Sequence, residues 1–184
     1  MTEHFFGYGS LVNRSTHSYG AAEPARLAGW RRVWVHTAVR PLAYLSVEPD
    51  ADSTIQGLIA HVPGGDWAAL DAREHGYDRH PAQAEGAGGT RDIQVYAVPA
   101  GQGAAPALAH PILLSYIDVV IQGFLREFGL PGAEGFFATT RGWDAPILDD
   151  RASPRYPRAQ VLTPQEREVV DAGLLGVGAR VAGR

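Results

Sequence analysis

The longest apolar stretch of the chain, residues 110–129, restricts the fold more than any other feature. Asp118, Gln122 and Arg126 interrupt it at intervals of four residues, which places them along one stripe of a helix. The opposite side of that helix is apolar and carries Leu113, Tyr116, Ile117, Val120 and Phe124. A membrane helix needs about 20 uncharged apolar residues, and no such span occurs. We therefore predict an amphipathic helix that covers a globular core, with Pro111 in its first turn.

The first half of the chain is rich in strand signals. Runs of β-branched and aromatic residues between Gly, Pro and Asp predict strands at His4–Tyr8, Arg32–Thr37, Leu42–Val47, Ile55–Val62 and Asp92–Val98. Strands followed by helices favour an α+β fold with a closed or nearly closed sheet and helices against it. A length of 184 residues is typical of one domain.

Two further helices and one late strand are expected. A short helix is predicted at Asp66–His75, and a last helix at Pro164–Leu175. Thr163 immediately precedes that last helix, and Glu166 follows three positions later, which is the spacing of a capping box. The segment Pro131–Arg158 is expected to be irregular, with one strand at Gly135–Thr140.

Two amino-acid types are missing, and their absence restricts the chemistry. Without cysteine the chain has no thiolate nucleophile, disulfide or zinc–thiolate site. Without lysine it has no side-chain amine for a Schiff base and no Walker A loop. Any catalysis must therefore use carboxylates, histidine, tyrosine, hydroxyls or backbone groups.

Charge and pattern also limit the partners. The formal net charge of −4 provides no positive surplus for phosphates, so we expect no nucleic-acid partner. The N-terminal residues MTEHFFGYGS lack a basic run followed by an apolar one, so we expect a cytoplasmic protein with no membrane partner. The histidines lack the spacing of paired ligands on a helix, so no metal site is predicted. The sequence gives no prediction of oligomeric state.

The first candidate for chemistry is FFGYGSLVN at residues 5–13. An apolar strand runs into a Gly-x-Gly turn and a hydroxyl, and glycines let successive backbone N–H groups face one point, where a carboxylate or an oxyanion can bind. Three known motifs do not fit this segment. The dinucleotide fingerprint requires a glycine where Val12 stands, and the phosphate loop requires a lysine. The nucleophile elbow requires glycines in place of both Tyr8 and Val12. A plain β-turn is the alternative interpretation.

The second candidate is GGDWAALDAREHGYDRH at residues 64–80. If Asp66 caps a helix, one face of it carries Trp67, Leu70, Asp71 and Glu74. Glu74 then points into the protein, where burial disfavours the charged carboxylate and raises its pKa toward the range of a general acid or base at neutral pH. The alternatives are that Glu74 pairs with an inward arginine or is solvated, and Asp71 is a competing candidate.

A third segment concentrates charges of both signs among prolines between Arg141 and Arg158. It has two interpretations. The segment folds over a pocket mouth and presents an arginine to a substrate carboxylate, or it is a salt-bridged surface segment that pins the tail.

The first two candidates, in this order, carry a family resemblance. Tyr8-Gly9-Ser10-Leu11 after the first strand, then Gly29–Trp34, Gly57, Leu70–Glu74 and Tyr77, resemble the γ-glutamylcyclotransferases of the ChaC-like or AIG2-like branch. The resemblance extends more weakly through the long helix, where Tyr116 corresponds to a tyrosine often seen there, and covers roughly residues 4–128. The His-Arg-Gly-Thr-Pro stretch of the glutathione-acting members is absent, and residues 36–41 read HTAVRP instead, which leaves the substrate open.

The resemblance implies a mixed β-barrel of six or seven strands flanked by helices. We expect a single domain over residues 1–184, with residues 131–184 as a C-terminal extension packed on it. The implied enzyme converts a small γ-glutamyl amine or peptide into 5-oxoproline without a cofactor. Glu74 is then the catalytic residue, and the expected substrate-binding residues are Tyr8, Gly9, Ser10, Leu11, Tyr77 and Tyr116.

Parts of this assignment have alternatives. Tyr8 and Tyr77 have core packing as a second interpretation. The alternatives to the cyclotransferase are a non-catalytic small-molecule-binding member of the same fold, and a hydrolase of γ-glutamyl compounds that uses Asp71 and Glu74 as paired carboxylates.

Overall fold

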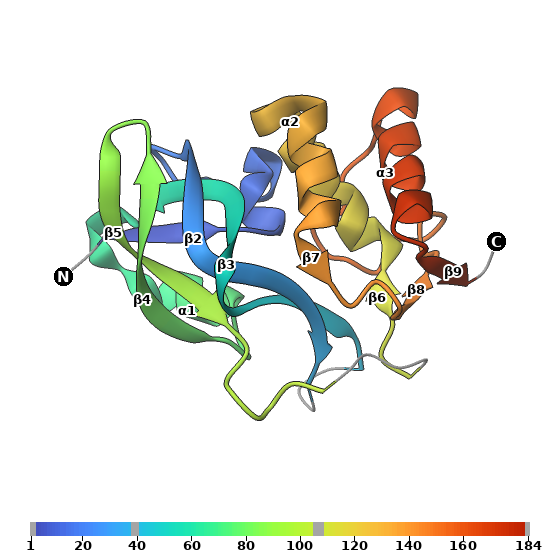
Figure 1. The fold of residues 1–184 in the computed structure, drawn as a ribbon, viewed down its shortest axis with the longest axis horizontal. Coiled ribbons are helices and arrows are strands. Elements are labelled where there is room, and N and C mark those ends of the chain that lie inside the picture. The colour runs from blue at the N-terminus through green and yellow to red at the C-terminus, as the bar shows by residue number, and fades with distance from the viewer. Residues whose placement is uncertain (1–2, 38–40, 105–108, 183–184) are drawn as a thin grey trace.

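A computed structural model describes residues 3–37, 41–104 and 109–182, and shows a β-barrel beside two packed helices (Figure 1). The strands are β1 (His4–Gly7), β2 (Glu23–His36), β3 (Ala43–His61), β4 (Asp78–Gly86), β5 (Gly89–Ala97), β6 (Ile112–Leu113), β7 (Thr140–Arg141), β8 (Pro146–Leu148) and β9 (Arg180–Ala182). The α-helices are α1 (Trp67–Arg73), α2 (Leu114–Ala138) and α3 (Pro164–Gly176). Short 3₁₀ turns cover Ser10–Val12, Arg14–Thr16 and Pro63–Gly65.

Five strands close the barrel. They follow the order β3-β1-β5-β4-β2, and β2 pairs again with β3. The β1–β5 pair is parallel, the other pairs of the closed ring are antiparallel, and β7 adds a sixth strand in parallel beside β2. The expected α+β fold with a mixed barrel flanked by helices is therefore confirmed. Strands β6, β8 and β9 form a separate small parallel sheet.

Two predicted strands, Leu42–Val47 and Ile55–Val62, are the two halves of β3. The pairing with β2 jumps from Trp30 opposite Pro49 to Ala28 opposite Thr54. The residues between Pro49 and Thr54 bulge out of the ladder, so the apolar pattern is interrupted although the strand continues. Of the stretch at residues 36–41 that departs from the resemblance, residues 38–40 lie outside the described residues.

The prediction for residues 131–140 was wrong. The expected strand at Gly135–Thr140 is mostly helix, because α2 continues to Ala138 after a kink. Gly129 has φ of +68° there, a conformation that glycine adopts at little cost, and Pro131 begins the second arm. The long helix also starts later than Pro111, because Ile112 and Leu113 pair with β8 as strand β6. The expected start of the C-terminal extension at residue 131 thus lies next to the kink, inside α2.

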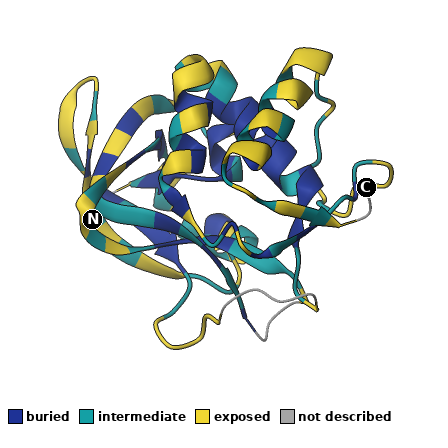
Figure 2. Ribbon diagram, turned by 45° about the vertical axis from the view of Figure 1, so that its right-hand side comes forward, coloured by how far each residue is buried: buried dark blue, intermediate teal, exposed yellow. Residues whose placement is uncertain are grey.

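The core has two parts. The larger one fills the barrel and continues between it and α2 and α3, with Phe6, Leu27, Ile117, Phe136 and Leu174 as buried members. The smaller part includes Phe5 of β1 and Leu70 of α1. Successive side chains of a strand point to opposite faces, which explains why Phe5 and Phe6 belong to different parts of the core. Figure 2 shows the buried residues of the helices on the sides that face the rest of the protein. Helix α3 begins with the predicted capping box of Thr163 and Glu166.

Candidate active site

The glycine turn follows β1 and leads into the 3₁₀ turn Ser10–Val12. The turn approaches α2 closely: a Cβ atom on Gly9 would lie 2.6 Å from the Tyr116 hydroxyl oxygen and 3.1 Å from a Leu45 methyl carbon. Ser10, the next residue of the turn, lines the cavity together with Tyr116. Only glycine leaves room for the Tyr116 hydroxyl next to the turn, which explains why glycine stands at position 9.

A buried guanidinium holds the turn from behind. Arg32 on β2 is 1% exposed, and its Nε donates to the Tyr8 carbonyl oxygen at 2.9 Å. Its other nitrogens donate to the Thr139 hydroxyl at 2.9 Å and to the Gln56 carbonyl, and the rings of Phe124 and Phe136 lie 4.9 and 5.0 Å from it. Burial lowers its pKa to about 9, so the group stays positive at neutral pH. The Tyr8–Gly9 peptide is thereby fixed in orientation.

Glu74 lies at the C-terminal end of α1. Asp66 caps the start of the helix by accepting a hydrogen bond from the Ala68 N–H, as predicted. Leu70 is buried on the inward face, and the Glu74 N–H donates to the Leu70 carbonyl at 2.9 Å, which brings Glu74 to that same face. Its side chain is 19% exposed. Helical spacing from the cap therefore carries the carboxylate inward.

Two arginines partly offset the effect of burial on the pKa of Glu74. Burial raises the pKa of Glu74, while Arg73 and Arg158 oppose the shift without cancelling it. Arg73 Nε lies 3.2 Å from Glu74 Oε1, and the same guanidinium donates to the Thr16 carbonyl and hydroxyl at 3.0 and 3.2 Å. The paired and the proton-carrying interpretations of Glu74 are thus compatible, because the carboxylate pairs with its neighbour and still faces the cavity.

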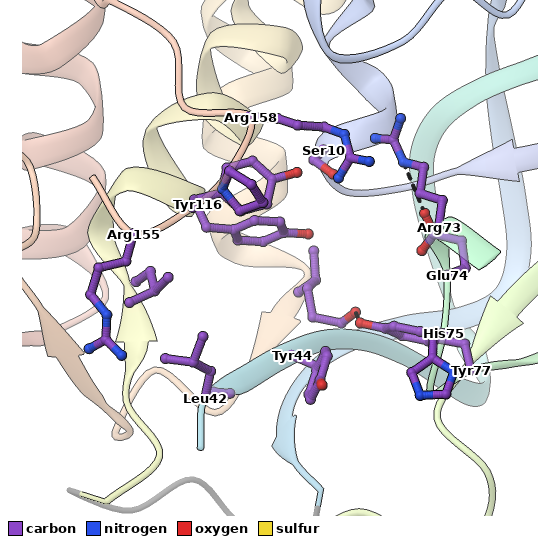
Figure 3. Close-up of a pocket in the computed structure, with 15 residues that line it drawn as sticks. Ser10, Leu42, Tyr44, Arg73, Glu74, His75, Tyr77, Tyr116, Arg155 and Arg158 are labelled. Atoms are coloured by element: carbon purple, nitrogen blue, oxygen red, sulfur yellow. Dashed lines mark hydrogen bonds and ion pairs between the residues drawn. The ribbon is translucent and has the colours of Figure 1, made fainter. Parts of the chain in front are cut away.

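The turn and Glu74 line the same cavity (Figure 3). Its outer part has a volume of about 200 Å³, and an inner recess of about 30 Å³ extends toward β1. Ser10, Glu74, Tyr77 and Tyr116 line both parts. The recess adds Tyr8, Gly9 and Leu11. The structure therefore brings together all seven residues that the sequence singled out.

The tyrosines of the cavity are also structural. The Tyr8 hydroxyl donates to the Tyr96 carbonyl at 2.6 Å, and the Tyr77 hydroxyl donates to the Leu45 carbonyl at 2.9 Å. Burial raises the pKa of Tyr8, Tyr77 and Tyr116, so their hydroxyls stay protonated at neutral pH. Packing and cavity-lining roles therefore coexist in these residues, and none of them is suited to act as a base.

The competing carboxylate, Asp71, does not line the cavity. Its side chain is 42% exposed, lies 3.0 Å from Arg79 Nε, and accepts a hydrogen bond from the Tyr96 hydroxyl at 2.6 Å. Asp71 thus contributes to the outer surface of α1, and the geometry separates it from Glu74.

The charged segment after residue 141 is salt-bridged to the helices and also reaches the cavity. Arg151 contacts Asp118 at 2.6 Å and Asp171 at 2.8 Å, which ties the segment to α2 and α3. Arg155 and Arg158, a few residues later, line the cavity (Figure 3). Sequence reasoning gave neither arginine a specific role, because nothing local shows where the segment ends up.

Buried hydrogen bonds fix this segment at the cavity. Asp150 is 6% exposed and accepts from the Ser115 N–H at 2.8 Å, the Ser115 hydroxyl at 2.6 Å and the Arg155 N–H at 2.8 Å. The Tyr156 N–H donates to the Ser115 hydroxyl oxygen at 3.3 Å, and the Tyr156 ring lies edge-on to Tyr116 with centroids 5.0 Å apart. The start of α2 therefore serves as the anchor of the cavity rim.

The described residues contain neither a metal-binding cluster nor a membrane-spanning helix. Within residues 3–37, 41–104 and 109–182, no three His, Asp or Glu side chains are grouped as metal ligands. No helix in this part of the chain combines the length and the apolar character needed to cross a bilayer.

Comparison with known proteins places this geometry in context. The family model described as gamma-glutamyl cyclotransferase, AIG2-like, matches residues 5–112, which include all of β1 except His4, the glycine turn and Glu74. The comparison with curated proteins found no match.

Several solved structures share the fold. A structure titled gamma-glutamyl cyclotransferase is 14% identical, with a TM-score of 0.58 over 92% of this chain and 98% of that chain. An uncharacterized protein from Homo sapiens is 14% identical, with a TM-score of 0.60 over 92% and 99% of the two chains. YkqA from Bacillus subtilis is 18% identical, with a TM-score of 0.58 over 71% and 51%. At these identities the likeness shows the fold alone.

Proposed function

The chain belongs to the gamma-glutamyl cyclotransferase, AIG2-like family, and on that premise we propose that it converts a small γ-glutamyl amine or peptide into 5-oxoproline and the free amine. The observation that carries the proposal is the position of Glu74. A carboxylate with a raised pKa shares a cavity with a glycine turn, and no second carboxylate lines that cavity among the described residues. One proton carrier beside an anion-binding turn is what an intramolecular acyl transfer requires.

The reaction needs little more than folding of the substrate. The α-amine and the γ-carbonyl belong to the same molecule, so holding them in attack geometry gains a large effective molarity. We assign the substrate α-carboxylate to the side of the cavity where Ser10 and Arg158 lie. The α-nitrogen then lies beside Glu74, and the γ-carbonyl lies toward the turn.

Glu74 moves the protons. As a carboxylate it removes a proton from the α-ammonium, and the free amine attacks the γ-carbonyl carbon to form the ring C–N bond. Backbone N–H groups of the glycine turn stabilise the oxyanion that develops on the carbonyl oxygen. The original amide C–N bond then breaks. Two protons leave the α-nitrogen in all, the departing amine takes up both as an ammonium ion, and no net proton is consumed.

The raised pKa of Glu74 suits this task. A carboxyl group whose pKa lies above its ordinary value is a stronger base toward an ammonium ion. The tyrosine hydroxyls stay protonated and provide walls and donors rather than bases. Arg32 holds the turn through the Tyr8 carbonyl and does not itself line the cavity.

Product analysis tests the proposal against its alternatives. The protein is incubated with γ-glutamyl-alanine, glutathione and ε-(γ-glutamyl)-lysine, and the mixtures are analysed for 5-oxoproline and free glutamate. We expect 5-oxoproline from at least one compound. Free glutamate without 5-oxoproline supports a hydrolase, and binding without turnover supports a non-catalytic member of the fold. The exposed position of Asp71, outside the cavity, already disfavours a paired-carboxylate hydrolase.

A further inference from the structure

The charges around the outer cavity do not balance. Three guanidiniums line it, those of Arg73, Arg155 and Arg158, against the single carboxylate of Glu74. Arg73 is engaged by Glu74 and Thr16. Two positive groups therefore remain for a ligand, and the cavity favours molecules with more than one negative charge.

The two remaining arginines lie on different sides of the cavity. Arg158 is close enough to Glu74 to oppose the rise of its pKa, and Figure 3 shows its guanidinium beside Ser10 and Arg73. Arg155 lies on the opposite side of the view, with the Tyr116 ring between it and Glu74. A substrate α-carboxylate next to the reacting nitrogen therefore has Arg158 as its partner, and Arg155 is left for a different group.

Arg155 is held at the rim but has no partner of its own. The buried Asp150 carboxylate accepts its backbone N–H, and Ser115 binds the next residue, so the start of this turn is fixed. Its side chain is exposed, and within the described part of the chain its guanidinium has no ion pair or hydrogen bond. Arg155 also lies outside residues 5–112, so it is not one of the matched family positions.

We propose that Arg155 determines specificity by binding a carboxylate on the leaving amine, so that a substrate with a free carboxylate next to the leaving nitrogen is preferred over its neutral amide. This inference rests on the proposed function. In such a compound the second carboxylate is two bonds from the leaving nitrogen and points away from the attacking amine. Arg155 likewise lies on the side of the cavity away from Glu74. A polyamine in the same place puts an ammonium group against a guanidinium, which is unfavourable.

The test compares two substrates that differ only in this group, γ-glutamyl-alanine and γ-glutamyl-alaninamide. We expect kcat/KM to be about tenfold higher for the acid, as one charge-assisted hydrogen-bonded contact provides. Arg155→Gln should remove this preference by lowering kcat/KM for the acid much more than for the amide, and Arg155→Lys should retain part of it. Arg26→Gln, on the exposed face of β2, makes the same change in net charge far from the rim in the fold and should keep the full preference.

Binding measurements separate this inference from the reaction. The same two ligands are titrated calorimetrically into Glu74→Gln and into Glu74→Gln/Arg155→Gln. If the parent protein releases no 5-oxoproline from γ-glutamyl-alanine, glutathione or ε-(γ-glutamyl)-lysine, the proposed function is contradicted, while tighter binding of the acid that depends on Arg155 still supports the subsite. Equal kcat/KM or equal affinity for acid and amide overturns the inference, as does a preference that survives Arg155→Gln.

Discussion

The two sides of the cavity are built in different ways. On the barrel side, which carries the glycine turn, hydrogen bonds hold Tyr8 at both ends. Its carbonyl accepts from Arg32, and its hydroxyl donates to the Tyr96 carbonyl. The rim side presents exposed arginines on an irregular segment that Asp150 and Ser115 fix through its backbone. Reacting atoms need fixed positions, whereas a charged end of a ligand can be held by a longer, exposed side chain. For the proposed reaction, we therefore expect the chemistry on the side of the glycine turn and Glu74 and the selection of substrate at the rim.

The most severe test of the barrel side is Glu74→Gln. It keeps the size of the side chain but removes the proton carrier, so we expect kcat/KM to fall by about 10²–10⁴-fold with binding of γ-glutamyl-alanine retained. Initial rates of 5-oxoproline release and calorimetric titration measure both. Asp71→Asn is the matched control and should change little, because Asp71 lies outside the cavity. An active Glu74→Gln beside an inactive Asp71→Asn means that the wrong carboxylate was assigned.

Gly9→Ala should come next in effect. The new Cβ atom would lie 2.6 Å from the Tyr116 hydroxyl oxygen, so the turn or the ring must move. A displacement near 1 Å of positioning groups costs about 10²-fold in rate, which we expect in kcat. Gly20→Ala adds a Cβ atom that meets nothing within 4 Å and is the control.

The double variant Gly9→Ala/Tyr116→Phe checks the cause of that loss. It removes the clashing oxygen and should recover part of the thermal stability that Gly9→Ala loses. No recovery would show that the Tyr116 hydroxyl is not what restricts this position.

Asp150→Asn addresses the rim. An amide cannot accept all three of the hydrogen bonds that Asp150 accepts, so we expect a loss of about 1–3 kcal/mol in the free energy of unfolding. A loosened rim should raise KM for γ-glutamyl-alanine more than it lowers kcat. The exposed Asp144→Asn is the charge-matched control for urea denaturation and kinetics. A fall in kcat alone would contradict the division between chemistry and selection.

The smallest effect concerns stability and pH. The pKa of Glu74 is raised in the folded protein above its ordinary 4.5, so the native state holds this proton more tightly than the unfolded chain. Stability from this group is complete below the ordinary pKa and is lost as pH rises through the raised pKa. Glu74→Gln lacks that loss, so its Tm relative to the parent should increase from pH 4 to pH 8. A relative Tm that decreases over this range contradicts the direction of the shift.

Local signals predicted the barrel side of the site well. Asp66 is a helix cap by its residue type and position, and helical spacing from it brings Leu70 and Glu74 to the inward face. The capping box at Thr163 and Glu166 is equally local. These features depend on neighbours within one or two turns, which is why a single sequence was sufficient.

Other features depend on partners distant in sequence. β4 was not predicted because its sequence, DRHPAQAEG, lacks apolar alternation and becomes a strand through its pairing with β5 and β2. Residues 135–138 were predicted as strand because their apolar residues fit either period, and packing of Phe136 and Phe137 in the core decides for helix. The position of Arg155 depends on hydrogen bonds of Asp150 with Ser115, which is 35 residues away in the sequence, and with the Arg155 N–H.

The surplus of guanidiniums around the cavity also affects how strongly the product of the proposed reaction binds. In the proposed reaction the glutamyl head enters with an ammonium and a carboxylate, whereas the lactam that remains has kept only its negative charge. A lining of three arginines and one glutamate attracts that lactam more strongly than the head group it came from. If the proposed reaction occurs, we therefore expect 5-oxoproline to compete with incoming substrate for the cavity.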